Sequence, residues 1–247
     1  MIGKGVSPAG ADDQRTPNPM ISGSGSGRAL VTSAVWMGVA STIGFGALAW
    51  FVVQNPSGTV DLRMLAWMRQ EASPMWDVAG RWVSYLGSEA ITVLVVALLI
   101  GLAIKRYWRV AGLLVATVGG AQLLNNVLKE LFHRTRPMPV AGLIPAQQYS
   151  FPSGHAMVSA AFYLFVLWLC WELVPGWAQI PLLASLAFIC IAIGIARMYV
   201  EAHYFSDVVA GGLAGFAWAD AVLLAARASL RRSLRMTKVM VPTSGET

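Results

Sequence analysis

Long apolar stretches recur along the chain, and short polar connections separate them. Six stretches are predicted as membrane spans, at residues 29–53, 90–104, 108–132, 155–173, 180–198 and 206–226. Each lies near the roughly 20 residues that a helix needs to cross the bilayer core, and 90–104 is the shortest. The pattern therefore predicts an all-α fold, a polytopic membrane bundle of about six transmembrane helices.

The segments outside these spans differ in composition. Residues 1–27 are rich in Gly, Ser and Pro, which predicts a disordered tail. The first span is too long for the apolar core of a signal peptide, so we expect it to remain as an anchor. Residues 54–89 mix Trp and Leu with Arg and Asp, which is typical of an interfacial segment. We therefore expect a membrane-embedded domain at 28–228 and a basic cytoplasmic tail at 229–247.

Composition and charge support a membrane location. Hydrophobic residues make up 56% of the chain and charged residues 12%, whereas a soluble domain has about 25% charged residues. The net charge of +6 alone would permit nucleic-acid binding, but most basic residues lie at the ends of apolar segments. We expect no nucleic-acid partner. Cys170 and Cys190 both lie in apolar runs, which favours neither a disulfide framework nor a metal site.

The positions of the basic residues also predict an orientation. Arg28, the connection 105–109 and the C-terminal tail concentrate positive charge, and cytoplasmic loops are enriched in Lys and Arg. Both termini are therefore predicted to be cytoplasmic. Counting spans from there places the connections 132–151 and 198–206 on the outer side. The expected location is the cell membrane (inner or plasma membrane), with these connections facing the periplasm or the exterior.

The first polar cluster spans the end of the third apolar stretch and the connection after it. Lys129 and Arg136 are seven residues apart, followed by Pro137, and they share one face if the helix persists. Cations are costly at membrane depth, so the pair either anchors the helix at the interface or binds an anion.

The second cluster, Pro152-Ser153-Gly154-His155, directly precedes an apolar stretch. Ser153 or Gly154 can cap the helix that follows, and the N–H groups at its start form an anion site. His155 beside this site could donate a proton to a leaving oxygen. Helix capping with a histidine at the interface is the alternative interpretation.

The third cluster contains Arg197, His203 and Asp207. The four-residue spacing from His203 to Asp207 lets a carboxylate orient an imidazole, which can then attack phosphorus. A helix start capped by Ser206 or Asp207 is the alternative. Taken together, the clusters supply two histidines and three cations, Lys129, Arg136 and Arg197, that could neutralise a phosphoryl group in transfer. We expect no metal and no cofactor, because the sequence offers no Asp, Glu or Cys cluster for a binuclear site.

In this order the clusters resemble the signature of the type 2 phosphatidic acid phosphatase superfamily, which reads K-x6-R-P, P-S-G-H and S-R-x5-H-x3-D. The resemblance covers about residues 129–215, and Ala196 stands where the family usually has serine. It implies a six-helix enzyme in which His203 forms a phosphohistidine, Asp207 orients His203, and His155 protonates the leaving alkoxide. It further implies that the phosphate is held by Lys129, Arg136, Ser153, Gly154 and Arg197.

The resemblance leaves the substrate open. Phosphatidic acid, phosphatidylglycerol phosphate, undecaprenyl diphosphate, a sphingoid phosphate and lipid A are all candidates. Soluble vanadium-dependent haloperoxidases share the site pattern but lack such a membrane domain, and vanadate is expected to inhibit as a transition-state mimic. A non-catalytic binder or transporter of anionic lipid head groups is the second hypothesis. It explains the cations but not an oriented nucleophile with a separate acid.

Overall fold

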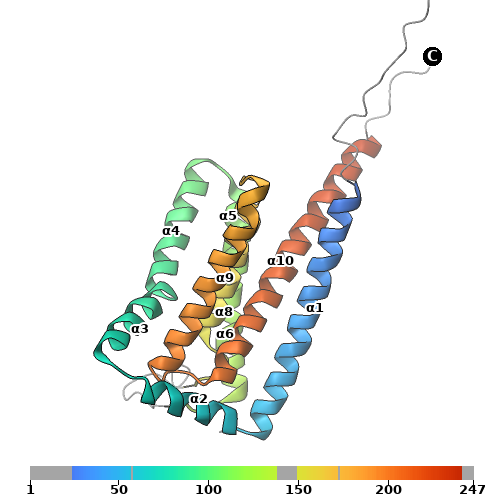
Figure 1. Cartoon of the computed structure of the whole chain (residues 1–247). Coiled ribbons are helices and arrows are strands. Elements are labelled where there is room, and N and C mark those ends of the chain that lie inside the picture. Colours follow the sequence, from blue (N-terminus) through green and yellow to red (C-terminus); the bar gives the residue numbers. More distant parts are fainter. Residues whose placement is uncertain (1–23, 57, 138–148, 172, 241–247) are drawn as a thin grey trace, which may run out of the picture.

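The computed structural model describes residues 24–56, 58–137, 149–171 and 173–240 (Figure 1). These residues form helices joined by short connections. The elements are α1 (Ser24–Gln54), α2 (Thr59–Gln70), α3 (Pro74–Leu86), α4 (Glu89–Ile104), α5 (Trp108–Leu114), the π-helical turn η1 (Val115–Gly119), α6 (Gly120–Phe132), α8 (Gly154–Cys170), α9 (Gly176–Tyr199) and α10 (Phe205–Met240).

The described residues confirm an all-α polytopic membrane bundle. Five helices are long and apolar enough to cross a bilayer, and α8 is a shorter apolar helix of 17 residues. Between 11% and 33% of each candidate span is buried inside the bundle. Most of their apolar side chains therefore face outward, as expected where lipid is the solvent.

Two predicted boundaries differ from the structure. The segment 54–89 is divided, because α2 lies across one end of the bundle whereas α3 continues towards α4, and the pair forms one candidate span, Pro74–Ile104 (Figure 1). Helices also extend into both predicted tails, since α1 begins at Ser24 and α10 continues to Met240. The rest of the predicted tails, 1–23 and 241–247, lies outside the described residues.

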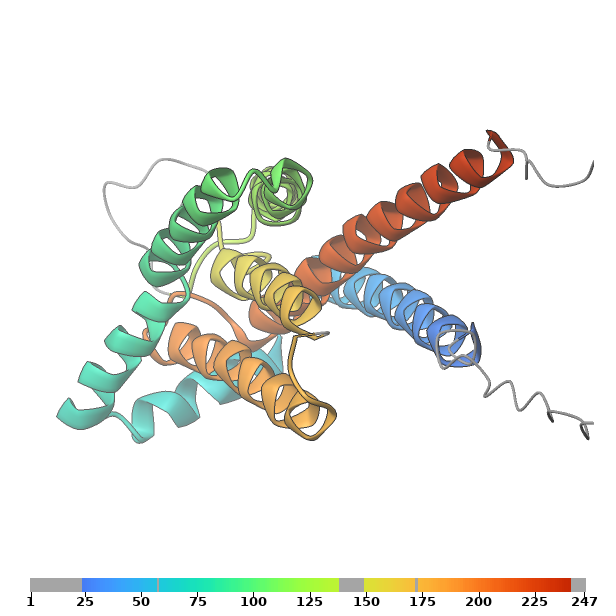
Figure 2. The same cartoon turned by 90° about the horizontal axis from the view of Figure 1, so that it is seen from above.

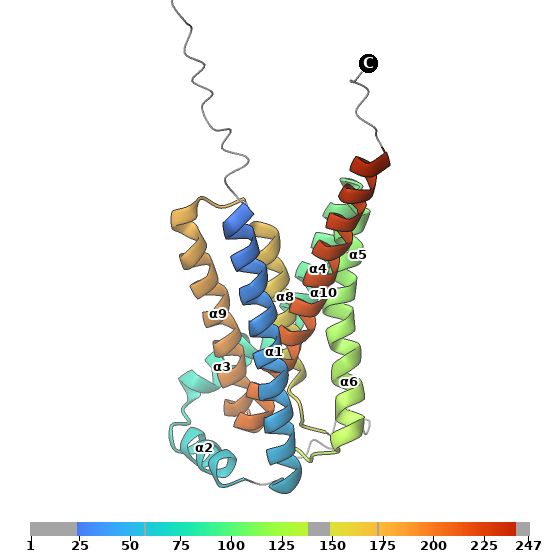
Figure 3. The ribbon, with the colours of Figure 1, turned by 90° about the vertical axis from the view of Figure 1, so that its right-hand side faces the viewer.

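The start of α1, the α4–α5 connection and the end of α10 lie at one end of the bundle, opposite α2 (Figures 1 and 3). This arrangement agrees with a common side for the two terminal helix ends. The basic connection 105–109 lies at that same end. Which side of the membrane it faces stays a prediction from the positive charges.

Helix α8 occupies the middle of the bundle, between α6, α9 and α10 (Figure 2). Two glycines of α10 permit its close contact with α8. A Cβ atom at Gly211 would lie 2.4 Å from the Ser153 carbonyl oxygen, and one at Gly215 would lie 2.1 Å from that of Met157. Glycines four residues apart let helix backbones approach closely in membranes. This contact fixes the start of α8 against the start of α10, where the predicted acid and nucleophile clusters lie.

Aromatic packing holds the second cluster against α1 and α6. Phe151 is fully buried, stacks on Phe45 of α1 and meets Phe132 of α6 edge to face, with ring centroids 6.0 and 4.9 Å apart. Such pairs stabilise beyond the area they bury. The connection that precedes His155 is thus held by α1 and α6 together.

Candidate functional site

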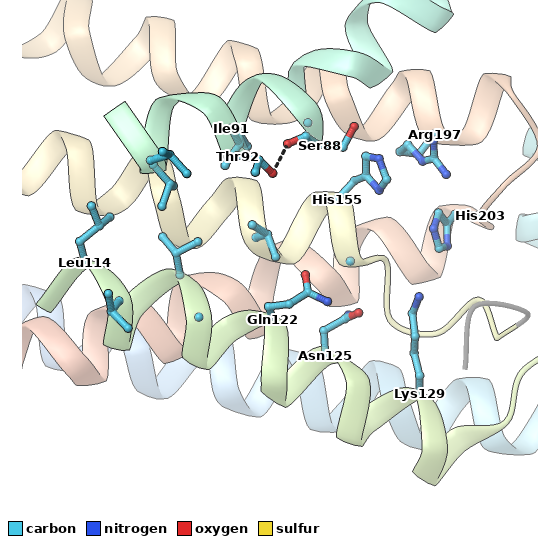
Figure 4. Close-up of a pocket in the computed structure, with 18 of the residues that line it drawn as sticks. Ser88, Ile91, Thr92, Leu114, Gln122, Asn125, Lys129, His155, Arg197 and His203 are labelled. Carbon is cyan, nitrogen blue, oxygen red and sulfur yellow. Dashed lines mark hydrogen bonds between the residues drawn. The ribbon is translucent and has the colours of Figure 1, made fainter. Parts of the chain in front are cut away.

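The three clusters meet around one cavity of about 510 Å³ at the α2 end of the bundle. Figure 4 shows Lys129, His155, Arg197 and His203 directed towards a common space. Six of the eight predicted site residues line it, namely Lys129, Arg136, Gly154, His155, Arg197 and His203. Ser153 and Asp207 are fully buried outside this lining.

Lys129 and Arg136 reach the cavity from different elements. Helix α6 ends at Phe132, because His133 adopts a left-handed conformation (φ 47°) and its N–H bonds to the Lys129 carbonyl. The helix does not persist to Arg136, so the condition under which both cations would share one helix face is not met. Arg136 instead reaches the cavity from the following connection, where its Nη1 donates to the Ala202 carbonyl at 3.1 Å. Burial lowers the pKa of the Arg136 guanidinium from its usual value.

The start of α8 points into the cavity. Ser153 is the N-cap, and its Oγ accepts a hydrogen bond from the Ala156 N–H, as the sequence predicted. At Gly154 the backbone lies close to Asn125, since a Cβ there would be 2.9 Å from Asn125 Oδ1 and would force that side chain to shift. Asn125 in turn donates to the Pro152 carbonyl at 3.1 Å. The helix N-terminus is thus presented without a covering side chain, which favours anion binding.

Arg197 lies across the cavity from Lys129 (Figure 4). Its Nη1 donates to Ser84 Oγ at 2.6 Å, whereas its Nε is buried without a hydrogen-bond partner among the described residues. Buried donors are almost always satisfied. An anion between Arg197 and Lys129 would supply the missing acceptor. Ala196, the departure from the family pattern, is buried and does not line the cavity.

The contacts of His203 define its tautomer. The ring is 1% exposed, and Nδ1 lies 2.9 Å from the Ser150 carbonyl oxygen. A carbonyl only accepts, so Nδ1 carries the hydrogen and Nε2 keeps its lone pair. Burial lowers the pKa of the imidazole to about 4, although Asp207 acts in the opposite direction. The lowered pKa favours the neutral imidazole at pH 7, with an unprotonated Nε2.

Asp207 contacts His203 at longer range than a hydrogen bond. Its Oδ2 lies 3.7 Å from His203 Nδ1 and accepts from the Tyr204 N–H at 2.9 Å. The Ser150 carbonyl thus makes the hydrogen bond to the ring, and Asp207 adds a negative charge beside it. The predicted orienting role of Asp207 stays a prediction, and Ser150 joins it as a second candidate.

Sequence reasoning also missed Arg134 and Asp61. Arg134 donates to Asp207 Oδ1 at 2.5 Å and to Asp61 Oδ2 at 2.7 Å. Arg134 lies between Lys129 and Arg136 in the first polar cluster, where sequence reasoning assigned it no role. Asp61 lies in the segment 54–89, which was predicted to be interfacial. No spacing rule connects Asp61 with a histidine 142 positions later, so only the folded chain brings them together.

The cavity changes character away from the cations. Its wall continues along apolar side chains of α4, α5, η1 and α8, among them Ile91, Val95, Leu114, Val118 and Val158. A phosphate at the cationic end would therefore have an apolar channel beside it. Among the described residues no group of three or more His, Cys, Asp or Glu side chains could hold a metal ion.

Comparison with known proteins agrees with this geometry. Residues 110–231 match the model of the PAP2 superfamily. Phosphatidylglycerophosphatase B of Bacillus subtilis is 35% identical over 103 residues, which cover 40% of this chain and 50% of that relative. The chain thus spans about half the length of this curated relative.

Two solved structures share the fold. The crystal structure of a transmembrane PAP2-type phosphatidylglycerolphosphate phosphatase from Bacillus subtilis has a TM-score of 0.67 and 25% identity, covering 76% of this chain and 94% of that one. Aquifex aeolicus LpxE has a TM-score of 0.52 and 23% identity, covering 68% of this chain and 96% of that one. The second likeness is one of fold alone.

Proposed function

We propose that this chain, whose residues 110–231 match the model of the PAP2 superfamily, hydrolyses a lipid phosphate monoester or diphosphate through a phosphohistidine on His203. The observation that carries the proposal is the pairing of a neutral, buried His203 with three cations around one cavity. The cations and the α8 N-terminus would hold the phosphoryl oxygens.

The proposed reaction has two steps. His203 Nε2 attacks phosphorus, the bond from phosphorus to the leaving oxygen breaks, and His155 donates a proton to that oxygen. Water then attacks the phosphohistidine, gives its proton to His155, and inorganic phosphate leaves with His203 restored. Lys129, Arg136 and Arg197 would stabilise the charge on the equatorial oxygens in both transition states.

The cavity wall favours a lipid over a soluble phosphate ester. Ile91, Leu114 and Val118 extend the cationic end into an apolar channel, which would keep the hydrocarbon part of a lipid out of water while its phosphate contacts the cations. The names of the Bacillus subtilis relatives make phosphatidylglycerol phosphate the first substrate to test. Phosphatidic acid and undecaprenyl diphosphate carry the same terminal phosphate and belong in the same panel.

The proposed side of the membrane rests on the distribution of positive charge. The site lies at the end of the bundle opposite the basic connection 105–109 (Figure 1). By the positive-inside rule we propose that the site faces the periplasm or the exterior. Cysteine substituted at exposed Met75 should then react with a membrane-impermeant maleimide in intact cells, and protection until lysis would reverse the orientation.

A non-catalytic lipid binder is the alternative function. It would need the cations, but it would not need a neutral imidazole with a fixed tautomer. The hydrogen bond from His203 Nδ1 to the Ser150 carbonyl therefore favours the enzyme.

The test is phosphate release by the purified protein in detergent with EDTA present, on the three lipids of the panel. We expect release that survives EDTA and is lost in His203→Ala, whereas Arg63→Ala on the exposed face of α2 serves as the control. Equal release by wild type and His203→Ala would exclude His203 as the nucleophile. Binding of lipid without release would support the alternative.

A further inference from the structure

A buried ionic network lies behind His203, outside the lining of the cavity. The Arg134 guanidinium pairs with the carboxylates of Asp61 and Asp207, at 2.7 and 2.5 Å. The three side chains are between 0% and 3% exposed. They come from α2, the connection after α6, and the first turn of α10, so the network joins three elements around the nucleophile.

The guanidinium is held in one orientation by many partners. Its Nε and Nη2 donate to the Pro56 carbonyl at 3.0 and 2.8 Å, and Nη1 also donates to Ser206 Oγ at 2.7 Å. The guanidinium carbon lies 4.2 Å from the centre of the Tyr204 ring. Because the planar Arg134 guanidinium is fixed in this way, it determines where the Asp207 carboxylate lies.

Asp61 completes the arrangement from α2. Its Oδ1 accepts from the Ser206 N–H at 2.9 Å, and its Oδ2 accepts from Ser206 Oγ at 2.6 Å. The Ser206 N–H belongs to the first turn of α10, where backbone donors lack partners within the helix. Asp61 thus fixes the start of the helix that carries Asp207.

The charges of the network are matched to the reaction. Two carboxylates and one guanidinium leave one negative charge, and Asp207 Oδ2 places it 3.7 Å from His203 Nδ1. Attack on phosphorus turns the neutral imidazole into a cationic phosphoimidazole, which a nearby negative charge stabilises. A buried ion pair by itself is weak evidence for stability, whereas a position directly behind the nucleophile indicates a role in the reaction.

From these contacts we propose that Arg134 and Asp61 are positioning residues that hold the Asp207 carboxylate against His203 and so keep the nucleophile in its reactive orientation. The inference rests on the proposed phosphohistidine function. Neither residue contacts the cavity, so both act through Asp207 and α10.

The chain offers a matched control in a second ion pair, which joins α2 to the connection between α9 and α10. Arg69 donates to both oxygens of Glu201, at 2.6 and 2.5 Å, but the Arg69 side chain is 59% exposed. Arg69→Gln breaks a bidentate pair without touching Asp207 or His203. It therefore reports what the loss of a surface contact alone does to this region.

The experiment is rapid-quench single turnover with phosphatidylglycerol phosphate radiolabelled in its terminal phosphate, using the full chain in mixed micelles. It measures the amount of phosphohistidine formed per protein and the rate constant of its formation. Wild type and His203→Ala are run first. The variants are Arg134→Gln, Arg134→Lys, the nearly isosteric Asp61→Asn, and Arg69→Gln.

We expect Arg134→Gln and Asp61→Asn to slow phosphohistidine formation about 10–100-fold, by analogy with the loss of a residue that orients a metal-bound histidine. The reacting fraction should stay close to wild type, Arg134→Lys should restore part of the rate, and Arg69→Gln should match wild type. A lower reacting fraction with an unchanged rate constant would show a purely structural role and overturn the proposal. So would wild-type rates in both variants. If wild type forms no phosphohistidine, the proposed function fails first.

Discussion

The cationic end and the apolar wall of the cavity differ in how the chain builds them. Lys129, Arg136 and Arg197 come from three separate elements. Arg136 donates a hydrogen bond to the Ala202 carbonyl and Arg197 donates one to Ser84 Oγ. The apolar wall, by contrast, is an ordinary run of side chains on α4, α5 and η1. The proposed function therefore assigns the reaction and the choice of lipid to separate sets of residues, which predicts that each can be changed alone.

The largest effect is expected at the cationic end, at His203. Replacing it with Ala or Gln should lower kcat by at least about 10³-fold, since losing a nucleophile removes the covalent route. KM for each lipid should change little, because the cations and the apolar wall remain. Phosphate release from the three lipids checks this, and residual turnover within tenfold of wild type would contradict the assignment.

Arg197 is the next most sensitive position. Arg197→Ala should reduce kcat/KM by about 10²–10³-fold, as expected for losing one donor to a developing charge. Arg197→Lys should recover only part of this loss, because it cannot replace a fork that also bonds Ser84. If Arg81→Ala at the exposed rim causes an equal loss, overall positive charge, and not the placement of Arg197, would explain the effect.

The pH dependence sharpens the account of the nucleophile. The pKa of His203 is lowered to about 4 by burial. Its neutral form, and hence the attacking lone pair, persists as pH falls to about 4 and is lost below that value. We expect the acid limb of kcat/KM to lie well below the usual histidine value of about 6.5, after correction for the substrate, whose second phosphate pKa is about 6.

An acid limb of kcat/KM at about pH 6.5 that remains after this correction would contradict the lowered pKa of His203. Attack requires a neutral His203 and departure requires a protonated His155, so an alkaline limb for loss of the His155 proton should complete a bell-shaped profile. A flat profile between about pH 5 and 9 would show that the protonation states of the two histidines do not control the rate and would count against these roles.

The apolar wall should affect chain preference without changing the chemistry. Val118→Phe narrows the channel, and overpacking of about 1–3 kcal/mol should raise KM for long-chain lipids severalfold. Turnover of a short-chain soluble analogue should be unchanged. Leu131→Phe, on an outward position that is 68% exposed, is the control. Equal effects on long and short substrates would show that the hydrocarbon chain of the lipid does not bind in this channel.

The smallest effect is expected at Ala196. Serine there would add one hydrogen-bonding group, worth about 0.5–1.5 kcal/mol if it finds a partner. Because Ala196 is buried outside the cavity lining, any such hydrogen bond lies away from the proposed phosphate position, and kcat should stay close to the wild-type value. Steady-state kinetics of Ala196→Ser measures this, and a large gain in kcat would mean that the position acts on the reaction directly.

Much of the fold could be predicted from the sequence, because a bilayer allows few solutions. The apolar stretches correspond to α1, α4, α5 to α6, α8, α9 and α10, and the Ser153 N-cap lies where the motif indicated. The division of 54–89 could not be predicted, since α3 joins α4 only when its apolar face finds neighbours. Nothing local in Thr59–Gln70 shows that Asp61 is buried.

The site residues illustrate the same limit. Six predicted residues line one cavity because their motifs occur next to helix ends that the fold brings together. The hydrogen bond from Arg136 to the Ala202 carbonyl depends on the end of α6 before His133. His133 ends the helix by adopting a positive φ, and the sequence there contains no Gly or Pro that would have predicted this end. The Ser150 carbonyl was missed because every residue has one, and only its position makes it the partner of His203.

The most direct test of the central claim is to trap the phosphoenzyme. Wild-type protein quenched during turnover of phosphatidylglycerol phosphate should carry an acid-labile phosphate that peptide mass spectrometry places on His203. Arg69→Gln should give the same adduct, and His203→Ala should give none. Phosphate on another residue, or turnover by wild type with no adduct under conditions that preserve phosphohistidine, would contradict the account.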